Sequence, residues 1–320
     1  MNKKIFLLFL FVFLLMGISG CNKGQKFIEE AYILDPKEAL DLHSSKFEDD
    51  PEWKEIENFL HMIAKKDIDT IDRFYLYGSE PGYEKVATQN YGYLPFYTNE
   101  EVEIINEIVP KSNTDIRPGR NRTKTKYIVI HNTGMASPVM TASRLSQSIN
   151  NSNRQASWHF TVDDHEIYQQ LFIDEIGWHA GNPEGNNYGI GIEMAVYQGI
   201  DLNMAMRNTA KLTAWLMLAY NLEIKDVKRH YDFSGKNCPQ VLIEAERWEE
   251  FLDLVEIEYY GQKYFSDVEF IWESLSTKLD DEGKIISKAG KGDNVSYRVK
   301  VNFNGKKKIY QFASYLEKMI

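Results

Sequence analysis

The sequence contains very little cysteine, with only Cys21 and Cys238 among its 320 residues. This scarcity excludes the disulfide frameworks that hold small secreted domains together. A chain of this length can bury a hydrophobic core large enough to be stable without crosslinks. Both cysteines are therefore available for other roles.

An apolar run long enough to cross a membrane comfortably is also absent. The apolar stretch from Ile5 to Met16 follows the basic pair Lys3-Lys4 and is shorter than the roughly 20 residues of a transmembrane helix. We predict a secretory signal in residues 1–20. The sequence Ile18-Ser19-Gly20-Cys21 resembles the bacterial lipobox, which implies a lipid on Cys21 and attachment to the outer face of the bacterial cell membrane. An ordinary signal peptide is the alternative.

The chain lacks an excess of basic residues, since 47 acidic side chains against 37 Lys and Arg give a formal net charge of −10. Its 43% hydrophobic and 26% charged residues are typical of a soluble globular protein. We therefore expect no nucleic-acid partner. Basic residues gather only late in the chain, at Lys300 and 306–308. These lysines could meet anionic polymers or lipid head groups, but protection of a sheet edge explains them as well.

The segment from Arg229 to Pro239 carries the residue types of half a zinc site. Zinc binds histidine nitrogen and cysteine sulfur, and a catalytic zinc keeps three protein ligands. His230 and Cys238 supply two of them, and the best third candidate is His131, which ends an apolar strand predicted over 127–130. Taken singly, His230 could be a solvated loop histidine and Cys238 a buried small apolar residue.

Several separated motifs strengthen the metal-site interpretation. They are Ile128-Val129-Ile130-His131-Asn132-Thr133, Ala156-Ser157-Trp158-His159-Phe160, Gly177-Trp178-His179-Ala180-Gly181, Gly189-Ile190-Gly191-Ile192-Glu193 and Gly235-Lys236-Asn237-Cys238-Pro239. In this order they resemble the zinc-dependent N-acetylmuramoyl-L-alanine amidases related to phage T7 lysozyme and the peptidoglycan recognition proteins. The resemblance covers about half of the chain, from near Thr98 to about Val255.

The resemblance implies one zinc ion bound by His131, His230 and Cys238, with a zinc-bound water as the nucleophile. The water needs a base, and the tetrahedral oxyanion needs a cation besides the metal. Glu193 and Lys236 have these chemical types, and the family implies the same two roles for them.

The strand predicted over 188–196 draws attention to Glu193 independently. Its apolar face carries Ile190, Ile192, Met194 and Val196. On the other face, Glu193 is flanked by Gly191 and Ala195, and this cleared space predicts a pocket. Trp158 stands where some family members use a tyrosine, and an indole cannot act as an acid or a base. This departure favours Glu193 as the base.

Four further residues are predicted to line the substrate groove: Asn132, Trp158, His159 and His179. For the two histidines, burial in a strand with hydrogen bonds to the backbone is the competing interpretation.

We predict an α/β fold with a mixed central sheet flanked by helices, an N-terminal helical spacer and a small C-terminal all-β domain. The expected divisions are a signal peptide at 1–20, a spacer at 21–97, a zinc amidase catalytic domain at 98–260 and a β-rich domain at 261–320. Because every candidate ligand precedes residue 262, the last region is expected to be dispensable for chemistry.

Periodicity and turn residues predict the individual elements. Helices are expected over 50–63, from the capping-box pattern at Thr98 to Pro110, from Ser137-Pro138 to Ile149, over 201–221 and over 245–259; strands over 158–162 and 166–171; a turn at 185–187; and a hairpin at Asn304-Gly305.

The expected function is hydrolysis of the amide between N-acetylmuramic acid and the L-alanine of the stem peptide in peptidoglycan. The choice of substrate follows from the resemblance alone. Two alternatives stay open: a lipid-anchored module that binds or senses peptidoglycan without turnover, and a zinc peptidase that cuts within the stem peptide.

Overall fold

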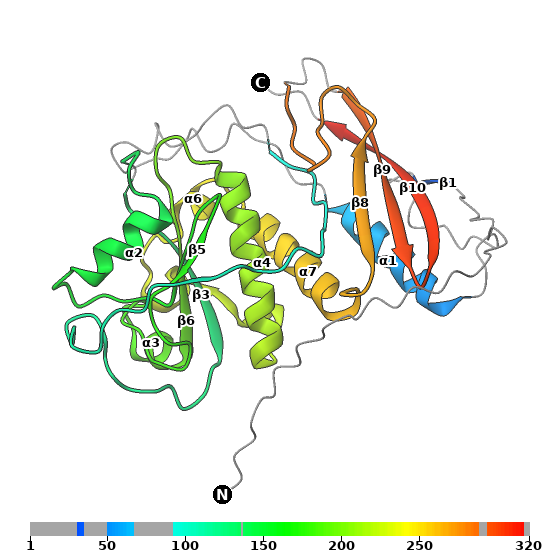
Figure 1. The fold of residues 1–320 in the computed structure, drawn as a ribbon. Coiled ribbons are helices and arrows are strands. Elements are labelled where there is room, and N and C mark those ends of the chain that lie inside the picture. Colours follow the sequence, from blue (N-terminus) through cyan, green and yellow to red (C-terminus); the bar gives the residue numbers. More distant parts are fainter. Residues whose placement is uncertain (1–30, 35–49, 67–91, 136, 288–292, 317–320) are drawn as a thin grey trace, which may run out of the picture.

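A computed structural model describes residues 31–34, 50–66, 92–135, 137–287 and 293–316 (Figure 1). The predicted signal at 1–20, the lipidation candidate Cys21 and much of the predicted spacer lie outside the described residues. Among the residues that are described, no helix has both the length and the apolar character needed to span a bilayer.

The larger of two sheets has six strands in the order β2-β5-β4-β6-β3-β7. The strands are β2 (Ile105–Asn106), β3 (Tyr127–Asn132), β4 (Phe160–Val162), β5 (Ile167–Gln169), β6 (Gly189–Met194) and β7 (Val227–Arg229). β4 and β5 are antiparallel, whereas the other neighbouring pairs are parallel. The predicted mixed sheet is thereby confirmed.

Seven helical segments accompany this sheet in the described part of the chain. They are α2 (Ala142–Asn150), α3 (Pro183–Tyr188), α4 (Leu202–Tyr220), η3 (Ile224–Asp226), α5 (Tyr231–Ser234), α6 (Gln240–Glu244) and α7 (Trp248–Tyr264). Asp201 caps the start of α4 by accepting from the backbone N–H of Met204, and Asn221 ends the helix in the left-handed conformation. Figure 1 shows α4 and α7 side by side, between the two sheets.

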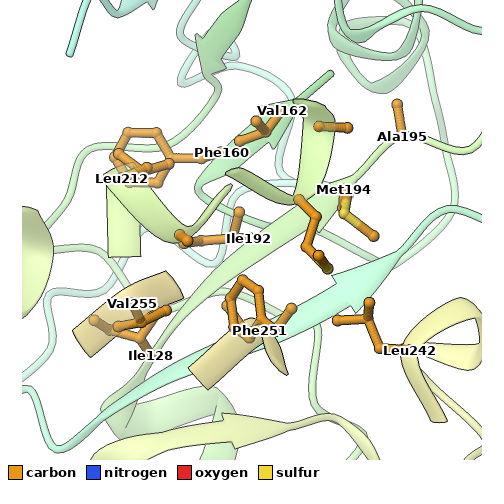
Figure 2. Close-up of a cluster of buried hydrophobic side chains, with 14 of the residues drawn as sticks. Ile128, Phe160, Val162, Ile192, Met194, Ala195, Leu212, Leu242, Phe251 and Val255 are labelled. Carbon is orange, nitrogen blue, oxygen red and sulfur yellow. The ribbon is translucent and has the colours of Figure 1, made fainter. Parts of the chain in front are cut away.

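The apolar face of the large sheet packs against α4 and α7. Figure 2 shows Phe160 and Ile192 of the strands facing Leu212 of α4 and Phe251 of α7. The alternate residues of the central strands, including Ile128, belong to the same buried cluster. Because side chains alternate across a strand, the intervening residues of β3 and β6 point to the opposite face. That second face carries the polar residues described below.

The smaller sheet has the order β1-β10-β9-β8 and forms a second core with α1 (Pro51–Lys65). Its strands are β1 (Ala31–Leu34), β8 (Glu269–Ser274), β9 (Asp293–Phe303) and β10 (Lys306–Leu316). β9 and β10 form the predicted hairpin, with Asn304 and Gly305 both at positive φ in the turn.

The predicted N-terminal helix is present, but it is part of this second core rather than a separate spacer. Trp53 and Phe59 of α1 are buried against the sheet, and the Phe59 ring stacks on Phe265 at 4.7 Å between centroids. The lysines expected to protect a sheet edge lie instead on β9 and β10, the two inner strands of this sheet. Two of them form ion pairs: Lys300 contacts Glu273 at 2.5 Å and Lys308 contacts Glu57 at 3.9 Å.

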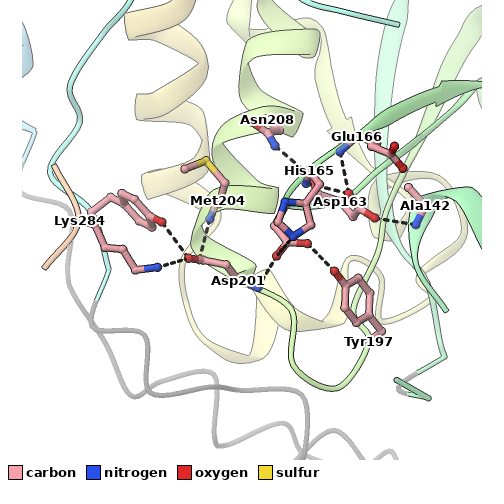
Figure 3. A network of polar contacts seen from close by, with 11 residues as sticks. Ala142, Asp163, His165, Glu166, Tyr197, Asp201, Met204, Asn208 and Lys284 are labelled. Atoms are coloured by element: carbon pink, nitrogen blue, oxygen red, sulfur yellow. Dashed lines mark hydrogen bonds and ion pairs between the residues drawn. The ribbon is translucent and has the colours of Figure 1, made fainter. Parts of the chain in front are cut away.

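A polar network joins the start of α4 to the segment that precedes β9 (Figure 3). Asp201 binds the Lys284 ammonium at 2.9 Å and accepts from the Tyr93 hydroxyl at 2.8 Å. On the other side of the same turn, Asp164 accepts from the Tyr197 hydroxyl at 2.6 Å. The Lys284 contact connects the second core to the first, whereas the contact between Asp164 and Tyr197 lies within the first.

Three predicted elements differ from the structure. Residues 98–110 are not helical, because Ile105 and Asn106 form the edge strand β2, which pairs with β5, and Asn99 donates instead to the backbone carbonyl of Phe265. The helix predicted from Ser137 begins at Ala142 with Thr141 as its cap. The predicted turn at 185–187 is the helix α3, which is capped by Asn182. In each case, tertiary pairing or an alternative cap satisfies the backbone and outweighs local preference.

Candidate metal centre and active site

The candidate site lies at the carboxyl ends of three parallel strands. His131 is near the end of β3, Glu193 is its register partner on β6, and His230 directly follows β7. Carboxyl ends of parallel neighbours meet at one edge of a sheet, so residues far apart in the sequence converge there.

The segment after β7 returns Cys238 to His230. It forms the single-turn helix α5, ends it with Gly235 at φ 73°, and closes with a hydrogen bond of 3.0 Å from the Tyr231 N–H to the Cys238 carbonyl. An ion pair of 2.7 Å between Arg229 and Asp232 holds the start of the loop. This closed loop therefore brings His230 and Cys238 together, as their spacing in the sequence predicts.

The three predicted ligands come together. His131, His230 and Cys238 are all buried, and one ligand atom from each lies within 4.8 Å of the others. His131 Nδ1 is 3.1 Å from His230 Nδ1 and 3.8 Å from Cys238 Sγ. Tetrahedral zinc, with bonds of about 2.0–2.1 Å to nitrogen and about 2.3 Å to sulfur, separates two nitrogens by about 3.3 Å and nitrogen from sulfur by about 3.6 Å. The observed spacings fit zinc.

The Nδ1 atoms of His131 and His230 face each other. A neutral imidazole has one N–H donor and one acceptor nitrogen. The outer nitrogen of His131 lies 3.1 Å from His179 Nδ1, and the outer edge of His230 hydrogen-bonds to the backbone of Ala180. If both outer nitrogens carry the proton, the two Nδ1 lone pairs face each other, an arrangement that a cation would stabilise.

Burial keeps both histidines neutral, as metal binding requires. Burial, followed by the nearby His179, His230 and Lys236, holds the pKa of His131 well below its usual value. Burial and Lys236 lower the pKa of His230 to about 4. Burial also raises the pKa of the Cys238 thiol to about 12 in the metal-free protein, against the opposing effect of the Asn132 backbone. A thiolate there requires a compensating cation.

Glu193 lies half-buried beside this group and has an unusual environment. Its Oε2 is shielded from solvent and has no hydrogen-bond partner among the described residues. Burial raises the pKa of its carboxyl group to about 8, although the charges of Lys236 and Arg154 act in the opposite direction. A carboxyl whose pKa is near neutrality suits proton transfer.

Lys236 is exposed on the loop that carries Cys238. Its charge lowers the pKa of His131 and His230 and opposes the burial effect on Glu193. The ammonium therefore lies within electrostatic reach of the whole group while keeping contact with solvent.

The space over Gly191, next to Glu193 on the same face of β6, is already filled. A Cβ on Gly191 would lie 2.8–3.0 Å from three atoms of the His179 ring, so that ring fills the space. Ala195 lies beyond the end of β6 and is buried in the apolar core. The interpretation of Gly191 and Ala195 as the walls of a pocket is wrong: the glycine makes room for a histidine.

His159 has the structural role that competed with substrate binding. It is fully buried; its Nδ1 accepts from the Gly191 N–H at 3.0 Å and its Nε2 lies 2.9 Å from the Glu175 carbonyl. These partners define a neutral ring protonated on Nε2, and burial together with Arg122 lowers its pKa further. This placement leaves no atom of His159 for a substrate.

Asn132 and Trp158 are also held by the protein. The amide oxygen of Asn132 accepts from the Val241 N–H at 3.1 Å and so anchors α6 to β3. Trp158 is half-buried and donates to the Thr161 hydroxyl at 2.7 Å. Of the four predicted groove residues, Trp158 therefore keeps the most contact with solvent.

Two residues near the site were not predicted. Arg154 is exposed and lowers the pKa of Glu193 through its charge. Asn186 accepts from the backbone N–H groups of His179 and Ala180 at 3.0 and 2.7 Å, which fixes the segment that carries the His179 ring. Only the turn-like composition around Asn186 signals it in the sequence.

This α/β domain brings a buried group of two histidines and one cysteine beside a carboxylate, and these residue types could hold one metal ion. Residues 121–241 match the family described as N-acetylmuramoyl-L-alanine amidase.

Curated relatives match over a similar region. N-acetylmuramoyl-L-alanine amidase CwlH of Bacillus subtilis is 40% identical over 155 residues, which are 48% of this chain and 60% of CwlH. N-acetylmuramoyl-L-alanine amidase XlyA of Bacillus subtilis is 38% identical, over 47% of this chain and 50% of XlyA. The chain thus spans between half and three fifths of these relatives.

A solved structure also matches this part of the chain. The catalytic domain of XlyA is 37% identical to this chain, with a TM-score of 0.46. The match covers 48% of this chain and 99% of the XlyA domain.

Proposed function

We propose that the protein is a zinc-dependent peptidoglycan hydrolase that cleaves the amide between N-acetylmuramic acid and L-alanine. The observation that carries the proposal is the convergence of His131, His230 and Cys238 beside Glu193. The family match over residues 121–241 supports this choice of substrate.

The donor set supports zinc as the cofactor. Two neutral imidazoles and one thiolate are typical zinc ligands, and three protein ligands leave one position of a tetrahedral site for substrate or water. When bound, zinc would polarise the amide carbonyl and lower the pKa of a water molecule. The remaining chemistry falls to the side chains around it.

Glu193 is the proposed general base. Its carboxylate would take a proton from the attacking water and later give it to the leaving amine, for which a pKa near the working pH is favourable. Because Oε2 has no hydrogen-bond partner among the described residues, it is available to the reactants. The Lys236 charge and a bound cation would both favour the ionised form that a base requires.

Lys236 is the proposed second partner of the oxyanion. An exposed ammonium on the ligand loop can approach the negative charge that develops on the carbonyl oxygen during attack. Its effect should appear in turnover more than in binding, because the charge exists only in the transition state.

We also propose that the protein is exported and that a lipid on Cys21 attaches it to the outer face of the cell membrane. The support is the short apolar stretch before the lipobox-like Ile18-Ser19-Gly20-Cys21. Such a tether would place the catalytic site against the cell wall. Labelling with a fatty-acid analogue tests it: label should appear in the wild type and be lost in Cys21→Ala.

The function is tested by digesting purified peptidoglycan and identifying the new termini by mass spectrometry. We expect free L-alanine amino termini from the wild type, none after zinc removal with a chelator, and recovery when zinc is restored. New termini within the stem peptide would indicate a peptidase instead. Binding of peptidoglycan with no new termini, at full zinc occupancy, would indicate a binding module.

A further inference from the structure

The ring of His179 lies between the candidate ligand His131 and the strand β6, and neither the zinc site nor the proposed catalytic groups account for it. His179 Nδ1 is 3.1 Å from His131 Nε2, the nitrogen that faces away from the other two ligands. The two rings meet edge to face, with centroids 5.2 Å apart. His179 is 8% exposed. It is therefore placed to act on His131 and not on a substrate.

Three glycines form a close-fitting seat for this ring. A Cβ on Gly191 would lie 2.8 Å from its Cγ, a Cβ on Gly177 would lie 3.1 Å from its Cδ2, and a Cβ on Gly189 would lie 3.3 Å from its Cε1. Contacts this short are rarely tolerated, so any side chain at Gly191 would displace the ring. The orientation of His179 is thus set by backbone on three sides.

The hydrogen-bonding possibilities of the pair leave two arrangements. In the first, His131 carries its proton on Nε2 and donates to His179 Nδ1, which leaves His131 Nδ1 free to bind a metal. In the second, His179 donates from Nδ1, and His131 would carry its proton on Nδ1, where it blocks the metal. His179 Nε2 is buried and has no hydrogen-bond partner among the described residues, so the contact with His131 is the only one that Nδ1 and Nε2 of this ring make there. Only the first arrangement leaves a lone pair on His131 Nδ1 for a metal ion that His230 and Cys238 also bind, so the proposed zinc site requires the first arrangement.

We propose that His179 is a positioning residue: it accepts a hydrogen bond from His131 Nε2–H and thereby fixes the tautomer and orientation in which His131 Nδ1 faces His230 and Cys238. Partners of this kind, on the far side of a ligand histidine, typically contribute ten- to hundred-fold to metal affinity. The inference rests on the proposed zinc site but not on the amidase activity.

Zinc affinity, measured by competition with a chromophoric chelator, provides the first test. His179→Phe keeps the ring but removes the acceptor, and we expect zinc to bind about ten- to hundred-fold more weakly. His179→Gln supplies an acceptor oxygen and should recover part of this loss. Gly191→Ala keeps His179 but pushes its ring away, so it should weaken zinc binding in the same direction. His165→Phe, at an exposed turn, is the control and should bind zinc as the wild type does.

Long-range ¹H–¹⁵N spectra of the metal-free wild type provide the second test, which needs no variant to fold. We expect the His131 proton on Nε2 and the His179 proton on its Nε2. A His131 proton on Nδ1 would overturn the proposal. So would a folded His179→Phe protein that binds zinc within about twofold of the wild type, since the ring would then be a space-filling core residue.

These outcomes separate this inference from the proposed function. A wild-type protein that binds no zinc contradicts the zinc site itself. A wild-type protein that binds zinc but releases no L-alanine termini contradicts the activity and leaves the His179 assignment standing. Equal zinc affinity in the wild type, His179→Phe and Gly191→Ala contradicts only the positioning role.

Discussion

The two faces of strands β3 and β6 consist of alternate residues of the same short segments, yet one face is apolar and the other is polar. On one face Ile128 and Ile192 are fully buried among apolar side chains of α4 and α7. On the other, His131 is buried with both ring nitrogens close to other histidines, and Glu193 is half-buried with an Oε2 that has no hydrogen-bond partner among the described residues. Buried polar groups normally find partners. One face therefore stabilises the fold, whereas the other carries the side chains to which we assign the proposed metal ion and substrate.

The largest difference between the faces is expected in turnover. Glu193→Gln keeps size and hydrogen-bonding capacity but removes the base, and losing a positioned base typically costs about a hundred- to ten-thousand-fold in rate. Zinc content and peptidoglycan binding should be unchanged. Release of L-alanine termini by the purified variant, at matched zinc occupancy, measures the effect. Wild-type rates from Glu193→Gln would move the base role to another group, with Lys236→Met the next variant to compare.

A change on the apolar face should have the opposite signature. Ile192→Ala removes buried methyl and methylene groups next to Phe251 and Leu212, and such truncations typically cost about 2–5 kcal/mol of stability. The folded fraction should still bind zinc normally, because no ligand is altered. Chemical unfolding of the wild type and the variant, followed by zinc titration below the transition, tests both statements. A loss of zinc affinity comparable to the loss of stability would show that the two faces are not independent.

Sequence patterns predicted the apolar strand face and several other elements well, because these follow simple periodicity or turn signals. The strand containing Ile190 and Ile192, the helix over 201–221 and the hairpin at Asn304-Gly305 all follow from spacing and turn residues that tertiary contacts do not contradict. The helix predicted from Thr98 fails for a physical reason: its backbone pairs with a sheet edge that no local pattern reveals.

The polar face was predictable in residue type but not in placement. The convergence of His131, His230 and Cys238 agrees with the ligand set that the motifs imply. The roles of His159 and His179 depend on which of them receives backbone hydrogen bonds, and that depends on distant partners such as Glu175. The joining of α1 to the C-terminal sheet is likewise a contact between segments some 200 residues apart, as Tyr310 and Glu57 illustrate with a separation of 253. Patterns in the local sequence cannot predict contacts between residues so far apart.

A smaller effect should appear in the pH dependence of stability. In the metal-free protein burial raises the pKa of Glu193 from 4.5 to about 8, so ionisation is less favourable in the folded than in the unfolded state. The resulting destabilisation is absent below about pH 4.5, grows between these two pKa values and is complete above about pH 8. Glu193→Gln cannot ionise and should therefore gain melting temperature relative to the wild type as the pH rises.

The measurement is a series of thermal melts of both proteins at pH 5, 7 and 9 in the presence of chelator. Glu55→Gln, on the solvent side of α1, is the control and should give no such divergence. A constant difference between Glu193→Gln and the wild type at all three pH values would mean that Glu193 ionises as easily in the fold as in water.

The smallest effect is expected where the two cores are joined by charge. Lys284 and Asp201 form an ion pair of 2.9 Å with side chains that are 36% and 17% exposed, and such partly exposed pairs contribute about 0–1 kcal/mol. Lys284→Met should therefore lower stability by less than about 1 kcal/mol and leave zinc affinity unchanged. Lys225→Met, whose pair with Glu223 is exposed at about 70% on both sides, is the matched control and should be closer to zero. Chemical unfolding of the wild type and the two variants shows whether this ion pair or apolar packing holds the two cores together. A loss of several kcal/mol in Lys284→Met alone would mean that the polar network of Asp201, and not apolar packing along α7, holds the second core against the first.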